Sequence, residues 1–396
     1  MAPRRPTEAD HIRLARDALS AGRISDAETA VRGVLSLDPE NGEALHLLGI
    51  IALQTGNTTA AEQHFRESIR VNELNAESHM NLGIALNILG RRDEGRVSLE
   101  RAAELKPTFA QAHYNLAMAE IDAGDMNAAR DRLQRAVRLS PKSNNMHTSL
   151  GGLLMQMGDT EAGLQHFRRA VALSPKSAIA HNNLGGAIQH TGDHETAITH
   201  FRKAQELDPE DVEPIINIAN SLSAQRKTDA AIKMYEEVIE KRPDYVGGYN
   251  NFGLALRYQG RFDEAVDALE QALEFAKPDS RVTSNLAETL SQAGRGEDAL
   301  VALKDHMEAA PDDGTINQIG ATLTGLGRFE EAAEVLNDAL DHNPDNVWAL
   351  TALADLGSHA LTEAQLARLE EAAAPEASND EKVGASLALA RWHDRR

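Results

Sequence analysis

The chain has 396 residues, no cysteine and a formal net charge of −21. Its length allows either several ordinary domains or one long repeat array. The missing cysteines exclude a disulfide framework, a thiolate zinc site and a cysteine nucleophile. The negative charge disfavours nucleic acid and anionic membrane surfaces as partners.

The first segment, Met1–Thr7, is predicted to be a short tail. It carries two arginines, but no apolar run follows them, which argues against a signal peptide. The most apolar stretch, Leu45–Leu53, is too short to cross a bilayer. These features predict a soluble, cytoplasmic protein. Thr7 and Asp10 have the spacing of a capping box for a first helix.

From about Glu8 onward the sequence repeats every 34 residues. Four columns of residues define the period. Prolines stand at Pro39, Pro107, Pro141, Pro175, Pro209, Pro243 and Pro311, with Pro278 and Pro344 one residue away from the grid. Glycines stand at Gly22, Gly56, Gly90, Gly124, Gly158, Gly192, Gly260, Gly294 and Gly327, and Arg226 interrupts this column. Two further columns hold only alanine or glycine, for example Gly83 and Gly185 in one and Ala197 and Ala265 in the other.

Each column has a physical explanation. A glycine ends a helix by adopting a left-handed conformation at little cost. A proline cannot continue the next helix and therefore marks the step to the following repeat. Small residues allow two helices to cross closely, and the apolar residues between the columns have helical spacing, as in Phe201, Ala204 and Leu207. The repeating unit is therefore predicted to be a helical hairpin.

These columns resemble those of the tetratricopeptide-repeat family. Leu184-Gly185, Ala197, Phe201 and Pro209 carry the motif in one repeat. The resemblance covers ten repeats over residues 8–346. It implies an all-α, right-handed superhelical solenoid whose first helices line a concave groove. Residues 347–396 are predicted to form a degenerate repeat followed by a helix that either caps the array or begins a further, truncated repeat.

One column carries the functional prediction. Asparagine precedes the leucine-glycine pair, or its equivalent, in six repeats, although asparagine is a mediocre helix former. A carboxamide can donate to and accept from the backbone of an extended peptide. The six residues are Asn81, Asn115, Asn183, Asn217, Asn251 and Asn285. In the alternative, structural interpretation they bond neighbouring repeats instead.

The asparagine column is similar to the ladder in the repeat region of O-linked N-acetylglucosamine transferases. That resemblance implies that the ladder holds the backbone of a protein partner. Further predicted groove residues on the first helices are Tyr114, Asn182, Asn220, Asn250 and Tyr258. The first helices almost lack lysine, so a chaperone-type carboxylate clamp is not expected. A peptide of basic or mixed character is favoured.

No catalytic constellation is predicted. His79, His113, His147 and His181 recur every 34 residues, but adjacent helices pack roughly 8–10 Å apart, too far for one zinc ion. This column is interpreted as packing. No P-loop, dinucleotide fingerprint or serine elbow occurs. No metal and no cofactor is expected.

The sequence therefore predicts a non-enzymatic scaffold that binds an extended peptide segment of a protein partner. An alternative is the substrate-recruiting arm of a glycosyltransferase- or sulfotransferase-type enzyme whose catalytic domain lies outside this chain. The C-terminal residues 361–396 weakly resemble the region between repeats in bacterial proteins that join tetratricopeptide repeats to a sulfotransferase domain.

Overall fold

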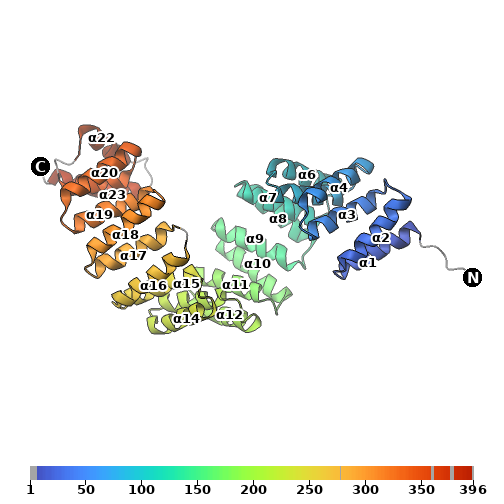
Figure 1. The fold of residues 1–396 in the computed structure, drawn as a ribbon, viewed down its shortest axis with the longest axis horizontal. Coiled ribbons are helices and arrows are strands. Elements are labelled where there is room, and N and C mark those ends of the chain that lie inside the picture. Colours follow the sequence, from blue (N-terminus) through green and yellow to red (C-terminus); the bar gives the residue numbers. More distant parts are fainter. Residues whose placement is uncertain (1–6, 277, 358–360, 375–378, 395–396) are drawn as a thin grey trace, which may run out of the picture. The chain divides into compact units, whose positions relative to one another are not determined.

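The computed structural model describes residues 7–276, 278–357, 361–374 and 379–394, and all regular structure in these ranges is α-helical. The chain divides into two compact units, Met1–Gly192 and Asp193–Arg396. The first unit holds α1 to α11 and the second holds α12 to α23 (Figure 1). Consecutive helices pack against one another within each unit.

First helices of 12 or 13 residues alternate with second helices of 14 residues along residues 8–342. The first helices of the ten repeats are α1 Glu8–Ser20, α3 Gly42–Gln54, α5 Ala76–Ile88, α7 Ala110–Asp122, α9 Asn144–Gln156, α11 Ala178–His190, α13 Glu213–Ala224, α15 Val246–Tyr258, α17 Ser280–Gln292 and α19 Asp313–Gly325. The second helices are α2 Ile24–Leu37, α4 Thr58–Val71, α6 Arg92–Leu105, α8 Met126–Leu139, α10 Thr160–Leu173, α12 His194–Leu207, α14 Thr228–Lys241, α16 Phe262–Phe275, α18 Gly296–Ala309 and α20 Phe329–His342. The predicted all-α repeat solenoid is confirmed.

The glycine column forms the turn between the first and second helix of a repeat. At the end of α5, the Gly90 N–H donates to the Asn87 carbonyl and the Arg91 N–H donates to the Leu86 carbonyl, at 3.0 and 2.9 Å. This pair of bonds is a Schellman motif, which requires a left-handed residue. The nine turn glycines have φ between 69° and 87°. Arg226 adopts the same conformation, with φ of 61°, and is the one non-glycine residue with positive φ in the described ranges.

The second helices begin in one of two ways. Where the residue after the turn is Asn or Asp, its side chain accepts from a backbone N–H three residues on, as Asp125 does from Ala128 at 3.0 Å. Where it is arginine, its guanidinium pairs with an acid three residues on, as Arg295 does with Asp298 at 2.7 Å. The first solution satisfies an unpaired helix donor. The second places the acid in the first turn, where the helix dipole favours negative charge. Lys227, which starts the second helix of the seventh repeat, uses neither.

The small-residue columns lie where the two helices of a repeat cross. A Cβ atom added to Gly83 would lie 2.6 Å from Leu99 Cγ and 2.8 Å from the Gly95 carbonyl oxygen. The alanine column on the second helices is fully buried, as at Ala61 and Ala265. Glycine and alanine are therefore required because the helix backbones nearly touch.

Each histidine of the column hydrogen-bonds the backbone of the connection that precedes its own first helix. The ring Nε2 atoms of His79, His113, His147 and His181 donate to the carbonyl oxygens of Glu73, Pro107, Pro141 and Pro175. The distances lie between 3.0 and 3.2 Å. Each acceptor stands six residues before its histidine, so this column combines packing with one regular hydrogen bond.

The C-terminal helices are α21 Val347–Leu356, α22 Glu363–Ala372 and α23 Asn379–Asp394. They form a core with α20 in which Trp392 is 1% exposed and packs with Leu350, Leu353 and Leu369. This packing covers the apolar face of the last repeat and so protects it from water. The final helix therefore packs back onto the array.

At the other end, Thr7 and Asp10 form the predicted capping box of α1. The rest of the predicted tail, residues 1–6, lies outside the described residues.

Candidate peptide-binding groove

The predicted asparagine column lies on six first helices. Asn81, Asn115 and Asn183 lie on α5, α7 and α11 of the first unit, whereas Asn217, Asn251 and Asn285 lie on α13, α15 and α17 of the second. All six side chains are half-buried. Each stands near the middle of its helix, because it directly precedes the position where the first helix crosses the second.

In the first unit the column makes few bonds of its own. Gln111 Nε2 donates to Asn115 Oδ1 at 3.2 Å. The Asn115 Nδ2 atom is enclosed and has no partner among the described residues. Beside it, the Tyr114 hydroxyl bonds the Ser149 hydroxyl across to α9, also at 3.2 Å. A buried donor without a partner is costly unless a ligand or water satisfies it.

In the second unit, amide side chains form a continuous chain across three first helices. Asn285 Nδ2 on α17 donates to Asn250 Oδ1 on α15 at 2.8 Å. Asn250 Nδ2 donates to Asn251 Oδ1, and Asn251 Nδ2 donates to Asn220 Oδ1 on α13, at 3.0 and 3.4 Å. These bonds join neighbouring repeats, as the structural interpretation of the column supposes, and they fix the orientation of each amide.

The predicted groove residues differ widely in exposure. Asn250 is 1% exposed, so its amide serves the chain of bonds just described. Asn182 on α11 and Asn220 on α13 are half-buried. Tyr258, the last residue of α15, is 64% exposed and presents a large aromatic ring to solvent. Exposed aromatic side chains are typical anchors of protein interfaces.

Cavities lie between consecutive first helices. One of about 420 Å³ between α13 and α15 is lined by Asn220, Asn251 and Tyr258, three of the predicted residues. Another of about 440 Å³ between α17 and α19 is lined by Glu288 and Gln318. Such volumes suit side chains of a bound segment.

Two further groups join these residues, and neither is among the predicted contact residues. The Tyr235 hydroxyl, from α14, donates to Asn220 Oδ1 at 2.6 Å, and burial raises the pKa of this phenol. Gln318 on α19 accepts a bond from the Ser284 hydroxyl at 2.7 Å. Tyr235 could have been found, because it is the one tyrosine in a column otherwise occupied by Phe, Leu and Val.

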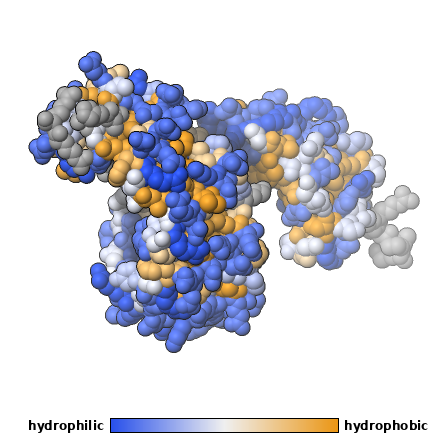
Figure 2. All heavy atoms as spheres, turned by 60° about the vertical axis from the view of Figure 1, so that its left-hand side comes forward, coloured by the Kyte–Doolittle hydropathy of each residue, from blue (hydrophilic) through white to orange (hydrophobic). Residues whose placement is uncertain are grey.

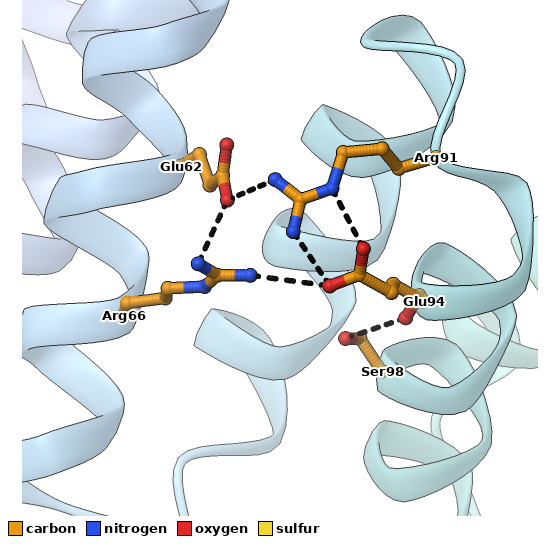
Figure 3. Close-up of polar contacts among 5 residues, drawn as sticks. All are labelled: Glu62, Arg66, Arg91, Glu94 and Ser98. Carbon is orange, nitrogen blue, oxygen red and sulfur yellow. Dashed lines mark hydrogen bonds and ion pairs between the residues drawn. The ribbon is translucent and has the colours of Figure 1, made fainter.

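Ion pairs lie mainly outside the amide surface. Figure 3 shows a cluster in which Glu62 and Arg66 of α4 meet Arg91 and Glu94 at the start of α6. Arg91 donates to Glu62 at 2.6 Å and holds Glu94 through two nitrogens, which lowers the pKa of the Glu94 carboxyl. Between two first helices, Arg257 of α15 pairs with Glu288 of α17 at 2.7 Å. On the face drawn in Figure 2, hydrophilic residues predominate and hydrophobic residues are interspersed among them.

The described residues contain no group of three or more His, Asp or Glu side chains placed to hold a metal ion. Among the same residues, no helix combines the length and apolar character that a membrane span needs.

The helical pairs, their turn glycines and their crossing columns define an α-helical repeat solenoid. Family models described as Tetratricopeptide repeat match residues 12–70, 56–108 and 148–212, residues 88–151 and 256–319, residues 211–278, and residues 316–356. The chain belongs to the tetratricopeptide-repeat family.

Solved structures agree with this fold. A tetratricopeptide repeat protein from Parabacteroides merdae is 18% identical, with a TM-score of 0.52, and the match covers 63% of this chain and 98% of that one. Yeast Tom70 is 15% identical, with a TM-score of 0.50, over 98% of this chain and 96% of that one. No curated protein gives a significant match to the sequence.

Proposed function

We propose that this chain is a protein-interaction scaffold that holds an extended peptide segment along its first helices. Repeat solenoids expose one continuous face to partners. The observation that supports the proposal is the set of half-buried carboxamides on the first helices of each unit, with cavities beside those of the second unit. The proposed contact residues are Asn81, Asn115, Asn183, Asn217, Asn251, Asn285, Tyr114, Asn182, Asn220 and Tyr258. The buried Asn250 supports them through its bonds to Asn251 and Asn285.

The mechanism follows from amide chemistry. Half-buried carboxamides present donors and acceptors at regular intervals, and an extended peptide presents N–H and C=O groups at regular intervals of its own. Such recognition tolerates many side chains, because it reads the backbone. In the second unit the bonds among Asn285, Asn250, Asn251 and Asn220 orient these amides before a peptide arrives, which reduces the entropy lost on binding.

Random twelve-residue peptides displayed on phage provide an unbiased probe. Wild type is compared with a triple variant, Asn217→Ala, Asn251→Ala and Asn285→Ala. Each lost hydrogen bond contributes about 0.5–1.5 kcal/mol to binding. The three substitutions together should therefore lower the affinity for an enriched peptide tenfold or more. The matched control replaces three exposed carboxamides on second helices, Gln63, Gln165 and Gln271, by alanine.

Two results would contradict the proposal. The first is that wild type enriches no peptide at all. The second is that the enriched peptides bind the triple variant as tightly as wild type. Melting temperatures of all three proteins show whether the asparagines act mainly on stability instead.

A further inference from the structure

The seventh repeat, α13 and α14, departs from the others at positions that meet in space. Asn220 is the one asparagine in its column, where other repeats have residues such as Ile84, Gly152 and Leu254. Tyr235 is the one tyrosine in its column, and its hydroxyl bonds Asn220. Arg226 replaces the turn glycine. Three unusual residues in one repeat indicate a local role that the other repeats lack.

The turn of this repeat departs from the rules that the other turns follow. Arg226 takes the left-handed conformation, which a side chain disfavours and glycine does not. Lys227 neither caps α14 nor pairs with an acid, since Ala230 stands three residues on. Arginines in the corresponding position, such as Arg261, pair with an acid. Strained residues that persist in a protein are often found at binding sites.

Arg226 and Lys227 are exposed and make no ion pair among the described residues. The nearest acid in the sequence, Asp229, accepts a bond from Gln259. The cationic turn therefore remains available to an anion from outside.

Arg226 also lines the cavity of about 420 Å³ between α13 and α15, together with Asn220, Thr228, Tyr235, Asn251 and Tyr258. Among the residues that the structure describes, no carboxylate lines this cavity. Asn220 Oδ1 accepts both the Tyr235 and the Asn251 bonds, so the Asn220 NH2 group is not used in either. The cavity thus combines one guanidinium, amide and hydroxyl donors, and an exposed aromatic ring.

We propose that this cavity binds the carboxylate of an aspartate or glutamate side chain in the partner's extended segment. Guanidinium groups bind carboxylates through two parallel hydrogen bonds. The net charge of −21 opposes a wholly acidic segment, so the acid is a single residue in an otherwise neutral or basic stretch. The cation comes from a turn rather than from a first helix. This inference rests on the proposed function, because it assigns one position of the same segment.

Arg226→Gly is the decisive variant, because it restores the residue that the other turns use. It should fold and should melt at the same or a higher temperature than wild type. Random twelve-residue peptides on phage should be enriched by wild type for Asp or Glu at one fixed position. The Arg226→Gly protein should lose that preference. Lys233→Ala, which removes an exposed cation on α14, should keep it.

The strongest enriched peptide is then synthesised with its acid, with the matching amide and with phosphoserine at that position. Replacing the acid by the amide should weaken binding to wild type about tenfold and binding to Arg226→Gly less than twofold. Equal binding of acid and amide peptides by wild type, or an unchanged acidic preference in Arg226→Gly, would overturn the assignment but leave peptide binding intact. Much tighter binding of the phosphoserine peptide would also overturn it, in favour of a phosphate site. If wild type enriches no peptide, the proposed function itself fails.

Discussion

Gly83→Ala should destabilise the protein although alanine is the better helix former. The exchange gains about 1 kcal/mol of helix stability in an unobstructed helix. Here the new methyl group would lie 2.6 Å from Leu99 Cγ and 2.8 Å from the Gly95 carbonyl oxygen, well inside the 3.5–4.0 Å of favourable carbon contacts. Leu99 can rotate, but the Gly95 oxygen belongs to the backbone of α6 and cannot turn away.

Overpacking of this kind costs about 1–3 kcal/mol of stability. Because the new methyl group meets backbone, the cost at Gly83 should lie at the upper end of that range. The net effect should be a loss of about 1–2 kcal/mol after the gain in helix propensity. Gly152→Ala is the matched control. Gly152 also lies within a first helix, α9, yet nothing lies within 4 Å of its added Cβ. That variant should gain about 0.5–1 kcal/mol.

Urea unfolding followed by circular dichroism at 222 nm measures both variants on the full chain. Hydrogen exchange then locates the change, which should fall in α5 and α6 for Gly83→Ala. If Gly83→Ala is as stable as wild type, the close crossing of α5 and α6 does not explain the glycine in this column. If both variants are equally stabilised, helix propensity alone governs the two positions.

Two further predictions concern charge. Arg91→Ala should lower the melting temperature, because it removes the partner that lowers the pKa of Glu94 and one of the two arginines that hold Glu62. A carboxyl whose pKa is lowered on folding stabilises the fold at pH values above its unfolded pKa of about 4.3, and this stabilisation is lost as pH falls through the folded pKa. The difference in melting temperature from wild type should therefore be present at pH 7 and shrink below about pH 4. A difference that does not depend on pH would contradict this origin. Burial lowers the pKa of His46, whose ring bonds the Ser78 hydroxyl at 2.8 Å. The unfolded histidine binds a proton near pH 6.5, whereas the folded one binds it only at lower pH, so the stability of the protein should fall as pH decreases below that value. In His46→Gln the urea midpoint should decline less between pH 7.5 and 5.5 than in wild type. The same decline in both proteins would exclude His46 as a contributor.

The repeat period made most of the fold predictable. The turn glycines, the small crossing residues and the helical spacing each reflect a local backbone requirement, so their positions could be read directly from the sequence. Arg226 interrupts the glycine column in the sequence, yet it occupies the same left-handed conformation. The surrounding repeat therefore determines the turn more strongly than the residue does.

The site was less predictable, because side-chain bonds between repeats depend on rotamers. The asparagine column was visible, but the bond from Asn285 to Asn250 and onward to Asn251 was not. Asn250 was predicted from its groove position, and its 1% exposure depends on neighbours that the sequence does not specify. The spacing of the histidine column predicts packing, whereas the bonds of these rings to carbonyls six residues earlier depend on ring orientation, which the sequence does not specify.

Those histidine hydrogen bonds affect how far local unfolding can spread from one repeat to the next. In a linear array each repeat contacts only its neighbours, so cooperativity depends on the strength of each junction. A bond from a first helix to the carbonyl of the preceding connection ties the end of one repeat to the beginning of the next. From the third to the sixth repeat these ties recur at His79, His113, His147 and His181. In the eighth repeat Tyr249 takes the position and instead stacks on Phe275. The junctions between repeats thus differ chemically. Where the histidine hydrogen bond is missing, local unfolding should be confined to fewer consecutive repeats.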